Sequence, residues 1–174
     1  MDSFDEIYKQ YYKLVYFYIF GLCGNRDVAE EVTQESFFRA LRKINSFKEN
    51  SSIKTWIITI ARNVFFDYCK KKKLEPLCFS EYFVSDESDD NPEENVTASG
   101  ADLEKEIQDK ETARIIRKAA ENLPEPYKEV FALRTFGELS FKEIGETSGK
   151  TESWARVTYH RARLMIKENL KDEV

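Results

Sequence analysis

A stretch near the carboxyl end of the chain combines cationic side chains with apolar residues at helical spacing. In TESWARVTYHRAR, residues 151–163, apolar positions recur at intervals of four, three and four and continue to Ile166. These positions predict the buried face of one helix: Ala155, Tyr159, Ala162 and Ile166. The opposite face then carries the cationic residues: Arg156, His160 and Arg163, with Arg161 at its flank. Such a row suits the major groove of DNA, where guanidinium groups reach guanine edges or phosphates.

The segment in front of this helix favours the same interpretation. Ser140 and Glu143 form the pattern S-x-x-E, which predicts a capped short helix carrying Ile144. The turn TSGKT follows, and Thr151 can cap the cationic helix. Two short helices joined by a glycine-containing turn, after a supporting helix in YKEVFALRTF, predict a helix-turn-helix. A cationic face can also be merely solvated; the cap and the turn spacing favour DNA.

The amino-terminal part of the chain predicts three amphipathic helices. The first runs from Phe4 to Leu22 and is expected to break in FGLCGN, which holds two glycines. The second begins at the N-cap Asn25. Its predicted buried stripe is Ala29, Val32, Phe37, Ala40, Leu41 and Ile44. The third follows the sequence NSS, keeps the i, i+3, i+4, i+7 pattern for four turns and ends in four lysines, residues 70–73.

Two polar sets accompany these helices. The second helix carries three residues at i, i+3 and i+4 that share one face: Glu31, Gln34 and Glu35. An acidic–amide face repels phosphates and favours a protein partner with a basic surface, unless it is only solvated. The third helix carries a set on or near its less buried side: Thr55, Thr59, Arg62, Asn63 and Phe66. With Phe47 and Lys48 in the preceding loop, this set suits single-stranded bases, although Phe47 and Phe66 can equally belong to the core periphery.

Charge is distributed unevenly along the chain. The net charge is −5, yet residues 74–104 hold ten acidic residues and no Lys or Arg. Residues 1–73 sum to +4 and residues 105–174 to +1. The acidic block is rich in Ser, Asp, Glu and Asn and lacks a periodic apolar face in its latter half, which is typical of a flexible linker. We therefore expect an all-α fold of two small helical domains, the second beginning with a helix near Asp102.

The sequence offers little to an enzyme. His160 is the single histidine, and Cys23, Cys69 and Cys78 lack the spacing of a metal or redox motif. No metal, cofactor or catalytic site is therefore expected. No apolar run reaches the roughly 18 residues of a membrane span, and reduced cytosolic thiols are expected. A separate hypothesis gives Cys69 a redox role, because the adjacent lysines could lower its pKa.

Three stretches, in this order, resemble a bacterial extracytoplasmic-function sigma factor, the smallest type in the sigma-70 family. They are DVAEEVTQESFFRAL, SFKENSSIKTWIITIARNVFFDYCKKK and LPEPYKEVFALRTFGELSFKEIGETSGKTESWARVTYHRARLMI. The resemblance covers almost the whole chain except the acidic linker. It implies a region 2 bundle in residues 1–73, a linker in residues 74–104 and a region 4 helix-turn-helix in residues 105–174.

The resemblance also implies residue roles. Region 2 would bind core RNA polymerase through the acidic–amide face: Glu31, Gln34 and Glu35. It would capture the −10 element during melting, with Asn63 lining the pocket for a flipped-out base. Arg62 lies beside it, and the framing loop holds Phe47, Lys48 and Asn50. Region 4 would read the −35 element through Arg156, His160 and Arg161, with Arg163 and Lys150 nearer phosphates.

The implied partners are core RNA polymerase, promoter DNA and an anti-sigma factor, which is often membrane-anchored. No small-molecule substrate is implied. The chain would be cytoplasmic, held at the inner face of the membrane when such an anti-sigma factor binds. Ser153, Trp154 and Ala155 replace the family's Gly-Thr-Val, and Thr158 replaces a common Arg, so the −35 sequence is not predicted.

One alternative stays open at this point: a one-component helix-turn-helix regulator with a helical sensor or dimerisation domain. Such a regulator would lack the melting features, so Asn63→Ala would leave its interaction with opened promoter DNA unchanged.

Overall fold

The structure, a computed structural model, describes residues 3–72 and 110–172 of the chain. The first range forms α1 (Phe4–Cys23), α2 (Arg26–Lys43), the 3-10 helix η1 (Ile44–Ser46) and α3 (Ile53–Lys71). The second forms α5 (Lys110–Glu121), α6 (Tyr127–Thr135), α7 (Phe141–Ser148) and α8 (Glu152–Asp172). These two ranges hold helices and no strands, so the predicted all-α class is confirmed. The acidic linker and the helix start near Asp102 lie outside the described residues.

Side-chain caps start three of these helices where the sequence predicted. The side chain of Asn25 accepts a hydrogen bond from the Val28 backbone N–H at 3.1 Å. The Thr151 hydroxyl accepts one from the Trp154 backbone N–H at 3.1 Å. Ser140 and Glu143 form the reciprocal capping box of α7. These bonds satisfy backbone donors that a helix start would otherwise leave without partners.

Helices α1, α2 and α3 pack into an N-terminal unit around one apolar core. Most of the stripe predicted for α2 is buried: Ala29, Val32, Phe37 and Ala40. Leu41 was predicted in that stripe but is 49% exposed. The prediction was wrong because the face of α2 covered by α1 and α3 is narrower than the apolar pattern. Helix α1 ends at Cys23, inside FGLCGN as expected, and Gly24 caps it in a left-handed conformation.

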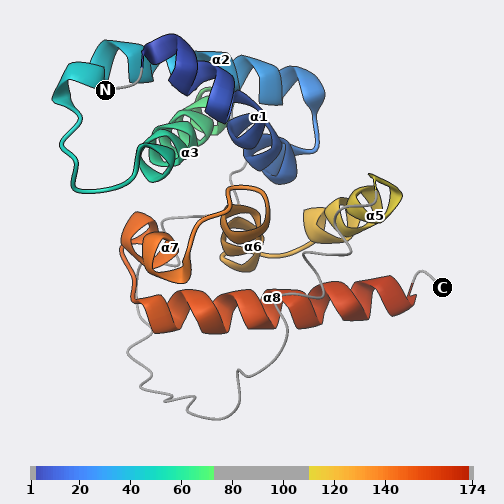
Figure 1. Ribbon diagram of the computed structural model, residues 1–174. Helices are drawn as coiled ribbons and strands as arrows, with labels where there is room; N and C mark the ends of the chain where they lie inside the picture. Colours follow the sequence, from blue (N-terminus) through green and yellow to red (C-terminus); the bar gives the residue numbers. More distant parts are fainter. Residues whose placement is uncertain (1–2, 73–109, 173–174) are drawn as a thin grey trace.

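In the C-terminal unit, α6 and α7 pack on the long helix α8, which runs along one side of the unit in Figure 1. The predicted inner face of α8 is buried: Ala155, Tyr159, Ala162 and Ile166. The Tyr159 ring stacks on Phe131 of α6, with centroids 6.0 Å apart and planes at 13°. On the opposite side of α8, His160 and Arg161 are exposed.

The two units lie against each other through α1 and α3 on one side and α5, α6 and α7 on the other (Figure 1). Gly21 faces the Phe136 ring, and the Arg117 guanidinium lies 4.6 Å from the Phe20 ring centroid. Their buried residues join in one continuous apolar cluster. Two domains predicted from sequence as separate modules therefore share an interface.

Candidate nucleic-acid and polymerase interfaces

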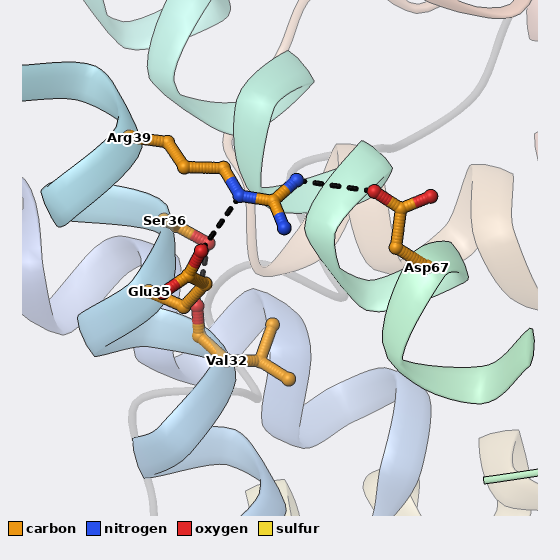
Figure 2. Close-up of polar contacts among 5 residues, drawn as sticks. All are labelled: Val32, Glu35, Ser36, Arg39 and Asp67. Atoms are coloured by element: carbon orange, nitrogen blue, oxygen red, sulfur yellow. Dashed lines mark hydrogen bonds and ion pairs between the residues drawn. The ribbon is translucent and has the colours of Figure 1, made fainter. Parts of the chain in front are cut away.

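The acidic–amide set of α2 lies on an open groove between α2 and α3. Glu31, Gln34 and Glu35 are exposed, as predicted, and they line a groove of about 640 Å³. Figure 2 shows how Arg39 joins the two helices: its Nε donates to Glu35 Oε1 at 2.7 Å, and its Nη1 donates to Asp67 Oδ2 at 3.1 Å. These hydrogen bonds raise the pKa of the Arg39 guanidinium. Arg39 thus holds one carboxylate of the predicted polymerase-binding face in place.

The sequence reasoning missed several residues of this groove. Phe38 is 55% exposed, and the Arg42 guanidinium lies 5.8 Å from its ring centroid. From α3, Asp67 and Tyr68 line the same groove. Arg39 also lines the groove, and the sequence contained a signal for it, because Glu35 and Arg39 stand at the i, i+4 spacing of a helical ion pair. An apolar ring beside charged side chains gives this surface the mixed character of a protein interface.

Most of the predicted −10 set is accessible at the start and outer edge of α3. Lys48, Asn50 and Asn63 are exposed. Phe47 is half-buried, and its ring packs on Trp56 with centroids 5.1 Å apart. These four side chains offer an aromatic face, a cation and two amides, which is the chemistry that unpaired bases accept.

The predicted −35 set lies on α8 and the turn before it, with unequal exposure. His160 and Arg161 are exposed, whereas Arg156, Arg163 and Lys150 are half-buried. Arg156 donates to Glu152 Oε1 at 2.9 Å, and its guanidinium lies 5.4 Å from the Phe141 ring centroid. Trp154, which departs from the family pattern, packs against the core. The cap at Thr151 and the packing of Trp154 therefore fix the position of the first turn of α8, just before Arg156.

Comparison with known proteins identifies the two units. Residues 7–75 match Sigma-70 region 2, and residues 113–166 match Sigma-70 region 4. The RNA polymerase sigma factor YlaC of Bacillus subtilis is 30% identical over 97% of this chain and 92% of its own length. The ECF RNA polymerase sigma factor SigW of the same organism is 30% identical over 98% of this chain and 90% of its own length. The chain belongs to the extracytoplasmic-function sigma factors. It is an alternative sigma factor, a subunit that directs core RNA polymerase to specific promoters.

Solved structures share the fold of this sigma factor. The sigma factor RpoE of Bartonella quintana, in complex with the anti-sigma factor NepR, aligns with a TM-score of 0.69 and 21% identity. That alignment covers 97% of this chain and 96% of RpoE. CnrH, in complex with the cytosolic domain of CnrY, aligns with a TM-score of 0.64 and 16% identity over 98% of this chain and 89% of its own. Both alignments show that this chain shares the helical arrangement of RpoE and CnrH.

Arg62 differs from the other predicted −10 residues because it is buried. Arg62 was expected on the less buried side of α3, with Thr55, but they are only 7% and 5% exposed. The expectation of exposure was wrong because the C-terminal unit covers this side of α3. The Nε of Arg62 donates to Glu129 Oε1, and Thr55 donates its hydroxyl to Glu143 Oε1 at 2.7 Å.

The contact around Arg62 is a buried cluster of ionisable groups from three helices and the turn before α6. Burial raises the pKa of Glu129, and the charge and hydrogen bond of Arg62 oppose that rise. Burial, and then the neighbouring Glu129 charge, raises the pKa of Glu125 to about 7. The Tyr18 hydroxyl of α1 is also buried, and burial raises its pKa. The cluster joins α1 and α3 of region 2 to region 4.

Two of the three thiols lie in the described residues, and neither shows a sign of activation; Cys78 lies outside the described residues. Cys23 and Cys69 are free, and burial raises the pKa of both. The hypothesis that the adjacent lysines lower the pKa of Cys69 was wrong, because desolvation dominates at this buried position. Within residues 3–72 and 110–172, no group of His, Cys, Asp and Glu could hold a metal ion. No helix in this part of the chain is long and apolar enough to cross a membrane.

Proposed function

We propose that this sigma factor consists of region 2 in residues 1–73, a linker in residues 74–104 and region 4 in residues 105–174. It uses three surfaces: one binds core polymerase and two bind promoter DNA. The observation that carries the proposal is the separation of the three residue sets. The acidic–amide set lines a groove between α2 and α3, the aromatic–amide set lies in the loop before α3 and on α3 itself, and a cationic side lies on α8. Each surface offers a different chemistry to a different partner.

The groove binds core polymerase. Glu31, Gln34 and Glu35 present carboxylates and an amide to a basic surface, and the exposed Phe38 ring adds apolar contact area. Charge complementarity of this kind raises the association rate and sets the orientation of the complex more than its raw affinity. Arg39 positions Glu35 for this contact through its two hydrogen bonds.

The two DNA surfaces read different forms of the promoter. Asn63, Arg62 and the loop with Phe47, Lys48 and Asn50 receive unpaired bases of the −10 element by stacking and hydrogen bonding to base edges. Arg156, His160 and Arg161 read the −35 duplex in the major groove, and Arg163 and Lys150 contact its phosphates. Each surface alone is weak, and joining both to one polymerase raises their effective concentration.

The remaining assignments follow from this role. The polymerase supplies the catalytic site, so the sigma factor itself is not an enzyme and needs no cofactor or substrate of its own. It acts in the cytoplasm, where polymerase and promoters are. An anti-sigma factor restrains it, as NepR and CnrY are partners of the structural neighbours RpoE and CnrH.

Reconstituted transcription with core polymerase on a genomic library tests the proposal and reveals the promoter. Chain-dependent initiation at specific start sites is the expected result. Arg161→Ala should weaken binding to the −35 duplex by about 1–3 kcal/mol, whereas Lys167→Ala, at an exposed position of the same helix, should have little effect. Failure of the purified chain to bind core polymerase would overturn the proposal.

Asn63→Ala tests the assignment of Asn63 to the −10 surface. We expect the variant to lose open-complex formation while keeping its affinity for the −35 duplex, because only unpaired bases reach Asn63. Asn169→Ala, on α8, is the amide control. Unchanged open complexes for Asn63→Ala would remove Asn63 from the −10 surface.

A further inference from the structure

The two units meet at an ion pair between Arg62 and Glu129 that is buried in the closed chain. Arg62 of α3 is 7% exposed and Glu129 of α6 is 3% exposed, and they bind each other across the interface. Removing one partner of a buried ion pair is strongly unfavourable because it leaves a desolvated charge without compensation. The pair therefore favours one specific closed arrangement over loose association.

Three more contacts make the closed arrangement specific. Thr55 donates its hydroxyl to Glu143 Oε1 at 2.7 Å, and the Lys54 ammonium donates to the Glu138 carbonyl oxygen at 2.6 Å. The Arg117 guanidinium of α5 lies over two rings, 4.6 Å from the Phe20 centroid of α1 and 5.7 Å from the Phe136 centroid. Polar and aromatic contacts thus accompany the buried pair along the same interface.

We propose that Glu129 is an internal competitor for nucleic acid: it occupies the Arg62 guanidinium that the −10 element would otherwise contact, so the units must separate before region 2 reads DNA in full. This inference rests on the proposed role of Arg62. A guanidinium donates the same fork of N–H groups to a carboxylate and to a phosphate or base edge. In the closed chain Arg62 is only 7% exposed and lies against Glu129, so DNA does not reach its guanidinium until the units separate.

Glu129 competes with nucleic acid for only one residue of the −10 surface. Lys48, Asn50 and Asn63 stay exposed in the closed chain. The closed sigma factor should therefore keep a weak affinity for single-stranded promoter DNA and gain affinity when Arg62 is released. Binding of region 2 to polymerase proceeds through the groove of α2 and α3, which is open in the closed chain.

The first test uses the full-length chain with Glu125→Gln and Glu129→Gln together. Both are needed because Glu125 faces Arg62 and could take over as its carboxylate partner. Glu168→Gln, at an exposed position of α8, is the matched control. Fluorescent labels on exposed positions of α2 and α8 report the separation of the units. Binding of a single-stranded oligonucleotide from the promoter's non-template strand reports access to region 2.

We expect the double variant to shift the equilibrium toward the open form by about tenfold or more and to bind the oligonucleotide several-fold more tightly. Its helical circular dichroism should match that of the parent, since the pair lies between units. A double variant that stays closed, or that opens without tighter binding, would overturn the proposal.

A cross-link tests the same inference in the opposite direction. Lys54→Cys and Glu138→Cys, in a chain whose three native cysteines are replaced, place two thiols across the interface for a short bis-maleimide. Cross-linking should reduce oligonucleotide binding several-fold, while either single-cysteine chain treated alike should bind as before. Equal binding with and without the link would refute the competition. Loss of promoter-specific initiation by the parent chain would instead refute the proposed function.

Discussion

Two arginines of region 2 form ion pairs in opposite surroundings. Arg39 bridges Glu35 and Asp67 with its side chain 34% exposed, whereas Arg62 meets Glu129 with 9% of its side chain exposed. Solvent and salt screen the first pair, so it contributes little to stability and mainly orients Glu35. The second pair is protected from water and depends on both partners. The same residue type thus positions a surface in one place and joins two units in the other.

Cys69 provides a prediction at the residue scale. Burial raises the pKa of its thiol, so the reactive thiolate is scarce near neutral pH. We expect iodoacetamide at pH 7.5 to label Cys69 much more slowly in the native chain than in urea, as followed by mass spectrometry of its peptide. The variant Lys70→Cys, which places a thiol at an exposed position, is the control for labelling in the native state. Equal rates at positions 69 and 70 would contradict the effect of burial.

At the scale of elements, short α7 depends on its first turn to form. It has eight residues, and Ser140 Oγ accepts the Glu143 N–H at 3.2 Å while Glu143 Oε2 accepts the Ser140 N–H at 2.8 Å. Helices this short are marginal without caps and packing. The capping box therefore helps to hold the turn that positions α8 for DNA.

Ser140→Ala tests this dependence. The variant loses the acceptor for one backbone N–H, which should lower the free energy of unfolding by about 1 kcal/mol, measured in urea by circular dichroism. Ser153→Ala, at an exposed position inside α8, is the control and should be nearly neutral. Equal stabilities of the two variants would show that packing alone holds α7.

Gly21 links helix α1 to the interface between the units. A Cβ at this position would lie 2.5 Å and 2.7 Å from two carbons of the Phe136 ring. Within a helix, Ala is favoured over Gly by about 1 kcal/mol. Gly21→Ala should therefore keep α1 intact and push the units apart, as measured by fluorescence transfer between them. Adding Phe136→Leu should restore closure; a single variant as compact as the parent would contradict the prediction.

At the scale of the whole molecule, closure is coupled to protons through Glu125. In the closed chain, burial and the Glu129 charge raise its pKa from 4.5 to about 7. The groups that face it are Glu129, Lys128, Arg62 and Tyr18. Because the closed form binds a proton more tightly, this contribution to closure is complete below pH 4.5 and is lost as the pH rises through about 7.

Closure should therefore strengthen by about tenfold between pH 8 and pH 6. The separation of labels on α2 and α8 measures this shift. Glu125→Gln keeps the side-chain shape and cannot titrate, so its curve should be nearly flat over the same range. A parent chain whose closure does not change between the two pH values would contradict the coupling.

Local pattern predicted a large part of this sigma factor. The caps at Asn25, Ser140 and Thr151 and the buried face of α8 follow from residues within a few positions of one another. They are confirmed because helix starts and helix faces depend on short-range spacing. The exposed acidic–amide face of α2 follows in the same way. The sigma family was identified for the same reason, since its motifs are contiguous stretches.

Other features depended on contacts between segments far apart in the chain. The exposure of Leu41 and the pairing of Asp67 with Arg39 depend on which helix lies opposite. The burial of Arg62 is the clearest case, because Glu129 is 67 positions away. Sequence by itself determined the helices, their chemistry and the family. Tertiary structure alone decided which polar side chains are covered, since burial is a property of two surfaces and a periodic pattern describes only one.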